Sequence, residues 1–136
     1  MSNIEKTLSI IKPDAVERNL TEQIKPFFIK NNLNIKASKK IHITKEEAAD
    51  FYKVHQSKPF YDDLCSYLSS GPIVVMILEG VDAVKKNREI MGATDPKNAK
   101  DGTIRKLFGV SIDKNSVHGS DSLENAKKEI SFFFKD

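Results

Sequence analysis

The chain has 136 residues, of which 39% are hydrophobic and 30% are charged, and its formal net charge is +3. These values predict one soluble globular domain spanning residues 1–136, with enough apolar side chains for a core that needs no disulfide or metal. So slight a charge does not by itself indicate a nucleic-acid surface. The single cysteine, Cys65, excludes an internal disulfide. No run approaches the roughly 20 apolar residues of a membrane span, and the N-terminus lacks an apolar signal region, so we expect a cytoplasmic protein.

The first predicted strand, Thr7 to Lys12, is closed by Pro13. Lys12 therefore ends a strand, where α/β folds place ligands, although a lysine there can also simply extend into water. The elements predicted next are a helical turn at 13–18, a helix at 21–31, a strand at 33–43 and a helix from 45 to about 55. Pro26 predicts a kink or a late start in the helix at 21–31.

A helical hairpin is predicted after the second strand. Thr44 and Glu47 have the spacing of a capping box for its first helix. Pro59 favours the start of its second helix, which extends to about Ser69. Phe60, at the corner between them, is our candidate for an exposed aromatic tip on a cleft wall. Burial of Phe60 in the core is an equally good interpretation of the sequence.

The third strand, 73–78, is continuously apolar, as expected of a central strand buried on both faces. Asp82 is expected to cap a helix that extends through Ile90 and carries Arg88 near its last turn. The stretch 91–115 is long and irregular, and one helical turn is predicted within it at 103–107. Long loops inside compact domains are often functional, and Thr94 and Arg105 are the polar candidates in this one.

His118 ends a predicted short strand at 116–118 and is followed by Gly119 and three residue types that cap helices. Asp121 and Glu124 fit a capping box for the last helix, whose apolar stripe is Leu123, Ala126, Ile130 and Phe133. Glu129 flanks that stripe, so its carboxylate can reach the His118 ring and fix its tautomer. The alternative is that His118 is a structural turn residue and Glu129 a solvated charge.

Without the helical hairpin and the long loop, the element order is β-α-β-β-α-β, the ferredoxin-like pattern. We therefore predict an α+β fold with an antiparallel four-stranded sheet, an inserted helical hairpin, and helices packed on one face of the sheet. The chain has neither phosphate-binding glycine motif and no Cys/His cluster. A histidine nucleophile among the cations Lys12, Arg88 and Arg105 suits phosphoryl transfer through a phosphohistidine.

Six separated motifs carry a resemblance to a known family. They are Ile11-Lys12-Pro13-Asp14-Ala15-Val16, Lys58-Pro59-Phe60, Ser70-Gly71-Pro72, Met91-Gly92-Ala93-Thr94-Asp95-Pro96, Gly102-Thr103-Ile104-Arg105, and Asn115-Ser116-Val117-His118-Gly119-Ser120-Asp121-Ser122. In this order and spacing, the chain closely resembles nucleoside diphosphate kinases along nearly its whole length, and its last motif matches the family signature.

The resemblance implies ping-pong transfer of the γ-phosphate of a nucleoside triphosphate, typically ATP, to a nucleoside diphosphate, which maintains NTP and dNTP pools. By resemblance, the catalytic set is His118 as nucleophile, Glu129 as the group that orients it, Ser120 and Lys12. The nucleotide-binding set comprises phosphate contacts by Lys12, Tyr52, Arg88, Thr94 and Arg105, sugar contacts by Asn115 and Lys12, stacking by Phe60, and apolar contacts by Leu64 and Ile112.

The resemblance also implies Mg²⁺ carried on the nucleotide phosphates, with no firm protein ligand and Asp121 as the one possible contributor. It implies a homo-oligomer, either a tetramer or a hexamer. Leu107 departs from the family pattern, in which an acidic residue usually stands at that position. Asn32 replaces a usual glycine, which asparagine can do because it tolerates the left-handed backbone.

Two other functions remain open from the sequence. One is a non-catalytic nucleotide-binding or scaffolding member of the same fold. Such a member would be recognised by the loss of His118 or of its supporting residues, but this chain has all of them. The other is a nucleic-acid-binding protein, suggested by aromatic residues and lysines. The small net charge and the missing recognition motif count against it, so we expect no specific nucleic-acid partner.

Overall fold

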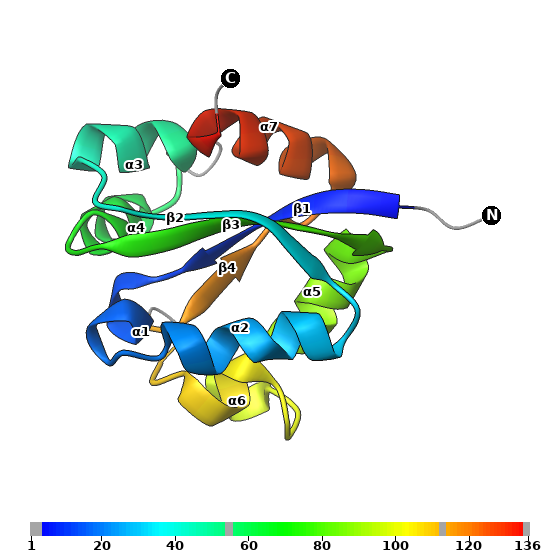
Figure 1. Cartoon of the computed structure of the whole chain (residues 1–136). Coiled ribbons are helices and arrows are strands. Elements are labelled where there is room, and N and C mark those ends of the chain that lie inside the picture. The colour runs from blue at the N-terminus through cyan, green and yellow to red at the C-terminus, as the bar shows by residue number, and fades with distance from the viewer. Residues whose placement is uncertain (1–3, 54–55, 112–113, 135–136) are drawn as a thin grey trace.

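The computed structural model describes residues 4–53, 56–111 and 114–134 (Figure 1). In chain order the elements are β1 (Ile4–Ile11), α1 (Pro13–Glu17), α2 (Thr21–Lys30), β2 (Asn34–Ile41), α3 (Lys45–Phe51), α4 (Tyr61–Leu68), β3 (Ile73–Val81), α5 (Ala83–Met91), the 3₁₀ helix η2 (Pro96–Asn98), α6 (Ile104–Phe108), β4 (Val117–Gly119) and α7 (Leu123–Phe133). Within these ranges, no helix is both long and apolar enough to cross a bilayer.

The four strands form one antiparallel sheet in the order β2-β3-β1-β4. This order and the β-α-β-β-α-β connectivity confirm the predicted α+β, ferredoxin-like fold with an inserted helical hairpin, α3 and α4. The register places Ser9 of β1 opposite Gly119 and Ile10 opposite His118. Because directly opposite residues in a sheet point to the same face, β1 fixes the face on which His118 lies.

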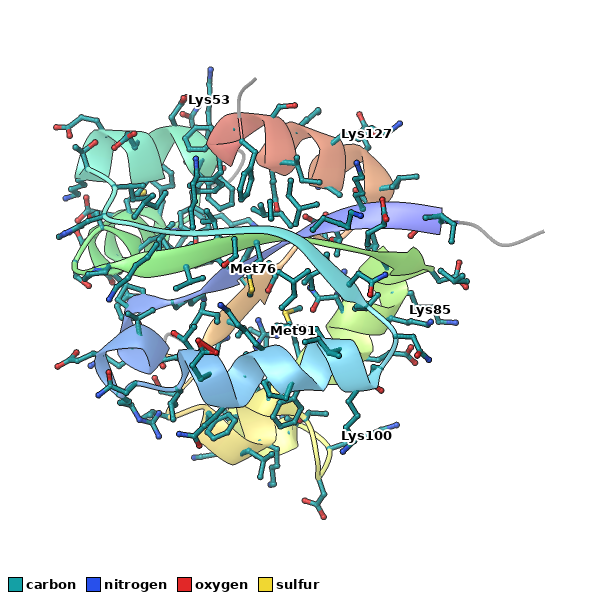
Figure 2. The ribbon with its side chains drawn as sticks, viewed as in Figure 1. Lys53, Met76, Lys85, Met91, Lys100 and Lys127 are labelled. Carbon is teal, nitrogen blue, oxygen red and sulfur yellow. The ribbon has the colours of Figure 1, made fainter. Side chains whose placement is uncertain are left out.

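Helices cover both faces of the sheet, so the expectation of helices on one face was wrong (Figure 1). Ile11, Val74 and Met76 pack with α1, α2, α5 and α6 on one face, whereas Leu8, Ile10 and others pack with α3, α4 and α7 on the other. The cause is that the central strands are apolar on both sides, and each side must be covered. Figure 2 shows Met76 and Met91 in the first of these layers, while labelled lysines point outward.

Two predicted helix starts were correct and one was not. Thr44 and Glu47 form the predicted capping box, with both reciprocal hydrogen bonds present. Helix α2 begins at Thr21 and contains Pro26, so the proline does not delay it. Burial of Ile24 and Phe28 on this helix offsets the missing amide. Helix α4, in contrast, begins at Tyr61, two residues after the proline that was expected to start it.

Asn32 and Asp82 are two of the four described non-glycine residues that adopt the left-handed backbone conformation glycine usually supplies. Asn32, just after α2, has φ 66°, which agrees with the expected tolerance of asparagine. Asp82 precedes α5 with φ 51°, and its side chain caps no amide of that helix. The predicted capping role of Asp82 was therefore wrong, because a cap residue needs an extended backbone to turn its side chain toward the helix. The hairpin's first helix was expected to end near His55, but α3 ends at Phe51 with Tyr52 as its C-cap, so this end was predicted too late.

Candidate active site

His118 lies on β4, on the face of the sheet covered by α3 and α7. Its ring meets the ring of Phe51, the last residue of α3, edge to face, with centroids 5.4 Å apart. The His118 side chain is 21% exposed, so apolar neighbours surround it while one side remains open to a ligand. The short strand thus presents an imidazole whose orientation is restricted by packing as well as by the backbone.

The carboxylate of Glu129, on α7, lies within hydrogen-bonding distance of the His118 ring, as the sequence predicted. The distance from His118 Nε2 to Glu129 Oε1 is 3.1 Å. The Ser120 hydroxyl donates to the same oxygen at 2.8 Å. Ser120 is fully buried and is itself held by β1, because its amide donates to the Leu8 carbonyl at 3.2 Å. Glu129 therefore has a fixed position from which it can hold one imidazole nitrogen.

Gly119 is required because α5 approaches β4 closely on the face opposite to His118. A Cβ atom at this position would lie 2.4 Å from Asn87 Nδ2 and 2.7 Å from Met91 Cε. Any side chain would force the Asn87 and Met91 side chains to shift. Asn87 is fully buried, and within the described part of the chain its amide atoms have no hydrogen-bond partner. Glycine thus lets the strand that bears His118 pack tightly against α5.

Lys12, Asn115 and Thr94 come together from three parts of the chain. Lys12 follows β1 and is buried, and its Nζ donates to Asn115 Oδ1 at 3.0 Å. The amide of Asn115 in turn donates to the Thr94 carbonyl at 3.0 Å. The long loop is therefore tied to the carboxyl end of β1, where a ligand was expected.

Arg105, on α6, is a buried cation in the same region. Its guanidinium donates to the carbonyl oxygens of Gly92 at 3.0 Å and Val117 at 2.9 Å. Burial, together with the nearby charge of Arg88, lowers the pKa of Arg105 to about 10, so it remains protonated at neutral pH. Its Nε has no hydrogen-bond partner among the described residues. A buried cation with an exposed second cation beside it favours an anionic ligand, whose charge offsets both.

The start of α7 differs from the prediction. Ser122 is the N-cap, and its hydroxyl accepts from the Asn125 amide at 3.1 Å. Asp121, predicted to cap with Glu124, accepts instead from the Asn125 side chain at 2.6 Å. That hydrogen bond holds the pKa of Asp121 below its usual range, with Arg88 and His118 adding to the effect. Leu123 is 41% exposed, so it does not belong to the buried stripe assigned to it.

These elements surround a cavity of about 1310 Å³. Ten of the predicted site residues line it: Lys12, Tyr52, Phe60, Leu64, Arg88, Thr94, Arg105, Asn115, His118 and Asp121. Phe60, directly before α4, is 45% exposed, which agrees with the aromatic tip rather than with the core alternative. Glu129 and Ser120 stand behind His118, and Ile112 lies outside the described residues.

The cavity lining combines a protonated phenol, apolar side chains and cations. Burial, with the charge of Glu129 nearby, raises the pKa of Tyr52 above its ordinary value, so its hydroxyl stays protonated. Phe60 and Leu64 reach the cavity from α4 and the residue before it, whereas Arg88 and Arg105 reach it from α5 and α6. This arrangement suits a ligand with a flat apolar part and an anionic part.

Some site neighbours were missed by sequence reasoning. Asp14 and Tyr67 share a hydrogen bond that joins α1 to α4, and Phe51 packs on His118. Asp14 lies within a quoted motif but was assigned no role. Tyr67 had one signal, its position three residues after Leu64 on the same side of the helix. Asn87 gave no signal, because its burial depends on the contact between α5 and β4.

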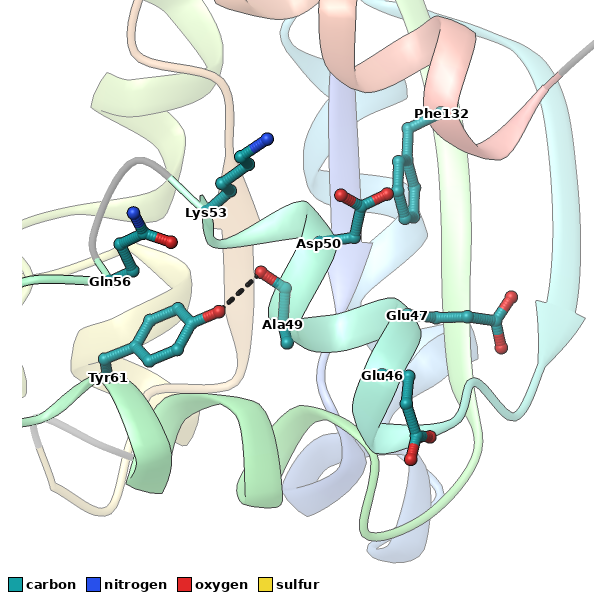
Figure 3. A pocket seen from close by; sticks show the side chains of 8 residues that line it. All are labelled: Glu46, Glu47, Ala49, Asp50, Lys53, Gln56, Tyr61 and Phe132. Atoms are coloured by element: carbon teal, nitrogen blue, oxygen red, sulfur yellow. Dashed lines mark hydrogen bonds between the residues drawn. The ribbon is translucent and has the colours of Figure 1, made fainter.

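A second hollow, of about 560 Å³, lies beside α3 and is lined largely by charged residues (Figure 3). In it the Tyr61 hydroxyl donates to the Ala49 carbonyl at 2.7 Å, which joins α4 to α3. It contains none of the predicted site residues. In the described part of the chain, no three His, Cys, Asp or Glu side chains are grouped so that they could hold a metal ion.

Comparisons of the sequence and of the structure with known proteins agree on one family. The family model described as nucleoside diphosphate kinase matches residues 5–136. The nucleoside diphosphate kinase of Nitratiruptor is 62% identical over 131 residues, which cover 96% of each chain, and that of Campylobacter jejuni is 60% identical over 132 residues, covering 97% and 96%. The crystal structure of the Aquifex aeolicus nucleoside diphosphate kinase superposes with a TM-score of 0.96 at 44% identity, covering 98% and 96%. This chain therefore belongs to the nucleoside diphosphate kinase family.

Proposed function

We propose that this chain is a nucleoside diphosphate kinase that transfers the γ-phosphate of a nucleoside triphosphate, typically ATP, to a nucleoside diphosphate through a phosphohistidine at His118. The observation that carries the proposal is the 3.1 Å contact between His118 Nε2 and Glu129 Oε1 at the wall of a cavity that also contains Lys12, Arg88 and Arg105. A carboxylate on one ring nitrogen leaves the other nitrogen as the nucleophile.

In the first half-reaction, the lone pair of His118 Nδ1 attacks the γ-phosphorus of the triphosphate. The bond from that phosphorus to the bridging oxygen breaks, and the nucleoside diphosphate leaves with the electron pair. The Nε2 proton stays on the ring and is shared with Glu129, whose charge stabilises the positive imidazolium. In the second half-reaction, a terminal oxygen of the acceptor diphosphate attacks the phosphohistidine and regenerates neutral His118.

The remaining cavity residues bind and align the nucleotide. Lys12, Arg88 and Arg105 offset the charge that spreads over the phosphoryl oxygens, with Tyr52 and Thr94 as further phosphate contacts. Asn115, held by Lys12 and the Thr94 carbonyl, contacts the sugar hydroxyls. Phe60 stacks on the base and Leu64 packs beside it. Since every base has a π-face, this contact does not select one nucleotide.

Mg²⁺ is the cofactor we propose, carried on the phosphates of the substrate. The cavity fits this mode of binding, because it contains the carboxylate of Asp121, whose pKa is held below its usual range. Mg²⁺ is commonly held by one or two carboxylates together with substrate phosphates. When bound, the ion neutralises phosphate charge. We also propose a cytoplasmic location.

The test uses His118→Ala, with His42→Ala as the matched control. His42 is exposed, contacts the Ser69 carbonyl at 2.8 Å, and does not line the cavity. With magnesium and γ-labelled ATP, the wild type and His42→Ala should form an acid-labile, base-stable phosphoenzyme and pass the label to added GDP. His118→Ala should bind nucleotide but take up no label. Transfer near the wild-type rate by His118→Ala would overturn the assignment, and nucleotide binding without label in the wild type would indicate a binding module instead.

A further inference from the structure

The Tyr67 hydroxyl joins the base-contacting helix α4 to the start of α1. It donates to Asp14 Oδ1 and accepts from the Asp14 amide at 2.9 Å. Asp14 is the second residue of α1, so its amide has no partner within that helix. One phenol oxygen therefore satisfies both the amide and the carboxylate of a residue that is only 8% exposed.

The phenol is suited to this double contact because it keeps its proton. Burial, followed by the hydrogen bond to the Asp14 carboxylate and then its charge, raises the pKa of Tyr67 well above its usual value. The hydroxyl thus remains a donor to the carboxylate over the whole physiological pH range. Removing the hydroxyl would leave both Asp14 groups without this partner in a largely buried place, which is a costly state for an ionised carboxylate.

The other carboxylate oxygen of Asp14 faces the segment that leads to His118. The Ser116 hydroxyl lies 3.5 Å from Asp14 Oδ2. Ser116 is fully buried and has φ 75°, a left-handed conformation that is unfavourable for serine and persists only when surrounding contacts hold it. Its carbonyl accepts from the Lys12 amide at 2.8 Å. Asp14 therefore stands between α4 and the backbone that carries Asn115.

The turn after α4 reinforces the same contact. A Cβ atom on Gly71 would lie 3.7 Å from Pro13 Cβ, so this turn packs against the residue between Lys12 and Asp14. Leu64 and Phe60 lie further toward the N-terminal end of α4, on the cavity wall. The end of α4 near Tyr67 is thus fixed, and the end that contacts the base extends from it.

We propose that Tyr67 is a positioning residue for nucleotide binding, which acts through Asp14 and Ser116 to set the separation between α4 and the residues Lys12 and Asn115. The inference rests on the proposed function, because it concerns how one nucleotide spans the distance from its base to its sugar and phosphates. It assigns to Tyr67 a role in binding that requires no contact with the substrate.

The primary variant is Tyr67→Phe, which keeps the ring and removes only the hydroxyl. The expected result is an increase of about tenfold in KM for both ADP and GDP, with kcat within about twofold of wild type, because the loss falls equally on ground-state and transition-state binding. Phosphorylation of His118 by phosphoramidate, which has neither base nor sugar, should proceed at the wild-type rate. If Tyr67 only stabilised the fold, Tyr67→Phe would leave KM unchanged, and the nucleotide and phosphoramidate reactions would not differ in their response.

The matched control is Tyr61→Phe, on the same helix. The Tyr61 hydroxyl donates to the Ala49 carbonyl and lines the other hollow, so this variant also loses one α4 hydrogen bond (Figure 3). It should lower stability and leave KM at the wild-type value. Asp14→Asn retains an oxygen that can accept from Tyr67 and should keep KM within about threefold of wild type.

The outcomes separate the two proposals. If the wild type takes up no label from either ATP or phosphoramidate, the proposed function fails. If the wild type is labelled but Tyr67→Phe keeps the wild-type KM, or Tyr61→Phe raises KM to the same extent, the positioning role fails while the kinase assignment stands.

Discussion

At the scale of single residues, the site depends on one oxygen of Glu129 that serves two partners. His118 Nε2 and the Ser120 hydroxyl both lie within 3.1 Å of Oε1. The Glu129 side chain is only 20% exposed, so water screens its charge weakly. The carboxylate can therefore both orient the imidazole and stabilise the positive charge that develops on it. Orienting the imidazole needs only a hydrogen-bond acceptor, whereas stabilising the positive imidazolium needs the negative charge of the carboxylate.

We expect Glu129→Gln to separate them. The amide oxygen can still accept from the ring, but it carries no charge, so phosphorylation of His118 should slow by about 10- to 100-fold. Single-turnover labelling with γ-labelled ATP measures this rate. Glu124→Gln is the control, because Glu124 is an exposed residue of the same helix that pairs with Lys128 at 3.6 Å. If the labelling rate of Glu129→Gln equals that of the wild type, the charge of Glu129 has no part in the phosphorylation of His118.

At the scale of elements, α3 connects local capping to the histidine. The helix has seven residues, too few for stability in isolation, and its capping box fixes where it begins. Its last residue, Phe51, packs on the His118 ring and on Phe132 and Phe133 of α7. A short helix held by its cap and by aromatic packing thus forms one wall around the imidazole.

We expect Thr44→Ala to lower the free energy of unfolding by about 1 kcal/mol, because the Glu47 amide loses its side-chain acceptor. Urea denaturation at fixed protein and nucleotide concentration measures the change. Thr21→Ala is the control, since Thr21 is the first residue of α2 and the preceding residue, Leu20, makes no side-chain cap. Equal effects of the two substitutions would show that the capping box contributes nothing specific.

At the scale of the whole molecule, two cores share a single sheet. β1 supplies Leu8 and Ile10 to one core and Ile11 to the other, and β3 likewise contributes to both. Neither core can form without the sheet that the other also needs. We therefore propose that residues 1–136 form one domain. The outer edge of β2 pairs with no strand of the described chain, and such edges are commonly covered by another element or chain.

We propose that the protein is a homo-oligomer, either a tetramer or a hexamer. Sedimentation equilibrium should then give a mass four or six times that of the 15.3 kDa chain. The exposed Leu107, Val110 and Ile29 are apolar residues that association can remove from water. A single species at the mass of one chain across the concentration range would contradict this proposal.

Much of the molecule follows from local sequence patterns. The alternation of apolar residues, the capping box at Thr44 and the continuous apolar run of β3 were sufficient to predict the fold class, because such patterns depend on residues close in the chain. The resemblance to the family identified ten site residues that the structure brings to one cavity. The contact between His118 and Glu129 was also predictable, since the two lie eleven residues apart across a single helix start.

The tertiary structure alone decided features that depend on partners distant in the chain. Coverage of both sheet faces, the exposure of Leu123 and the close approach of Asn87 to Gly119 follow from how helices pack on the sheet. Tyr67 and Asp14 are 53 residues apart, and Lys12 and Asn115 are 103 apart. Local periodicity shows which side of an element is apolar, whereas the register and packing of the sheet determine which polar side chains meet.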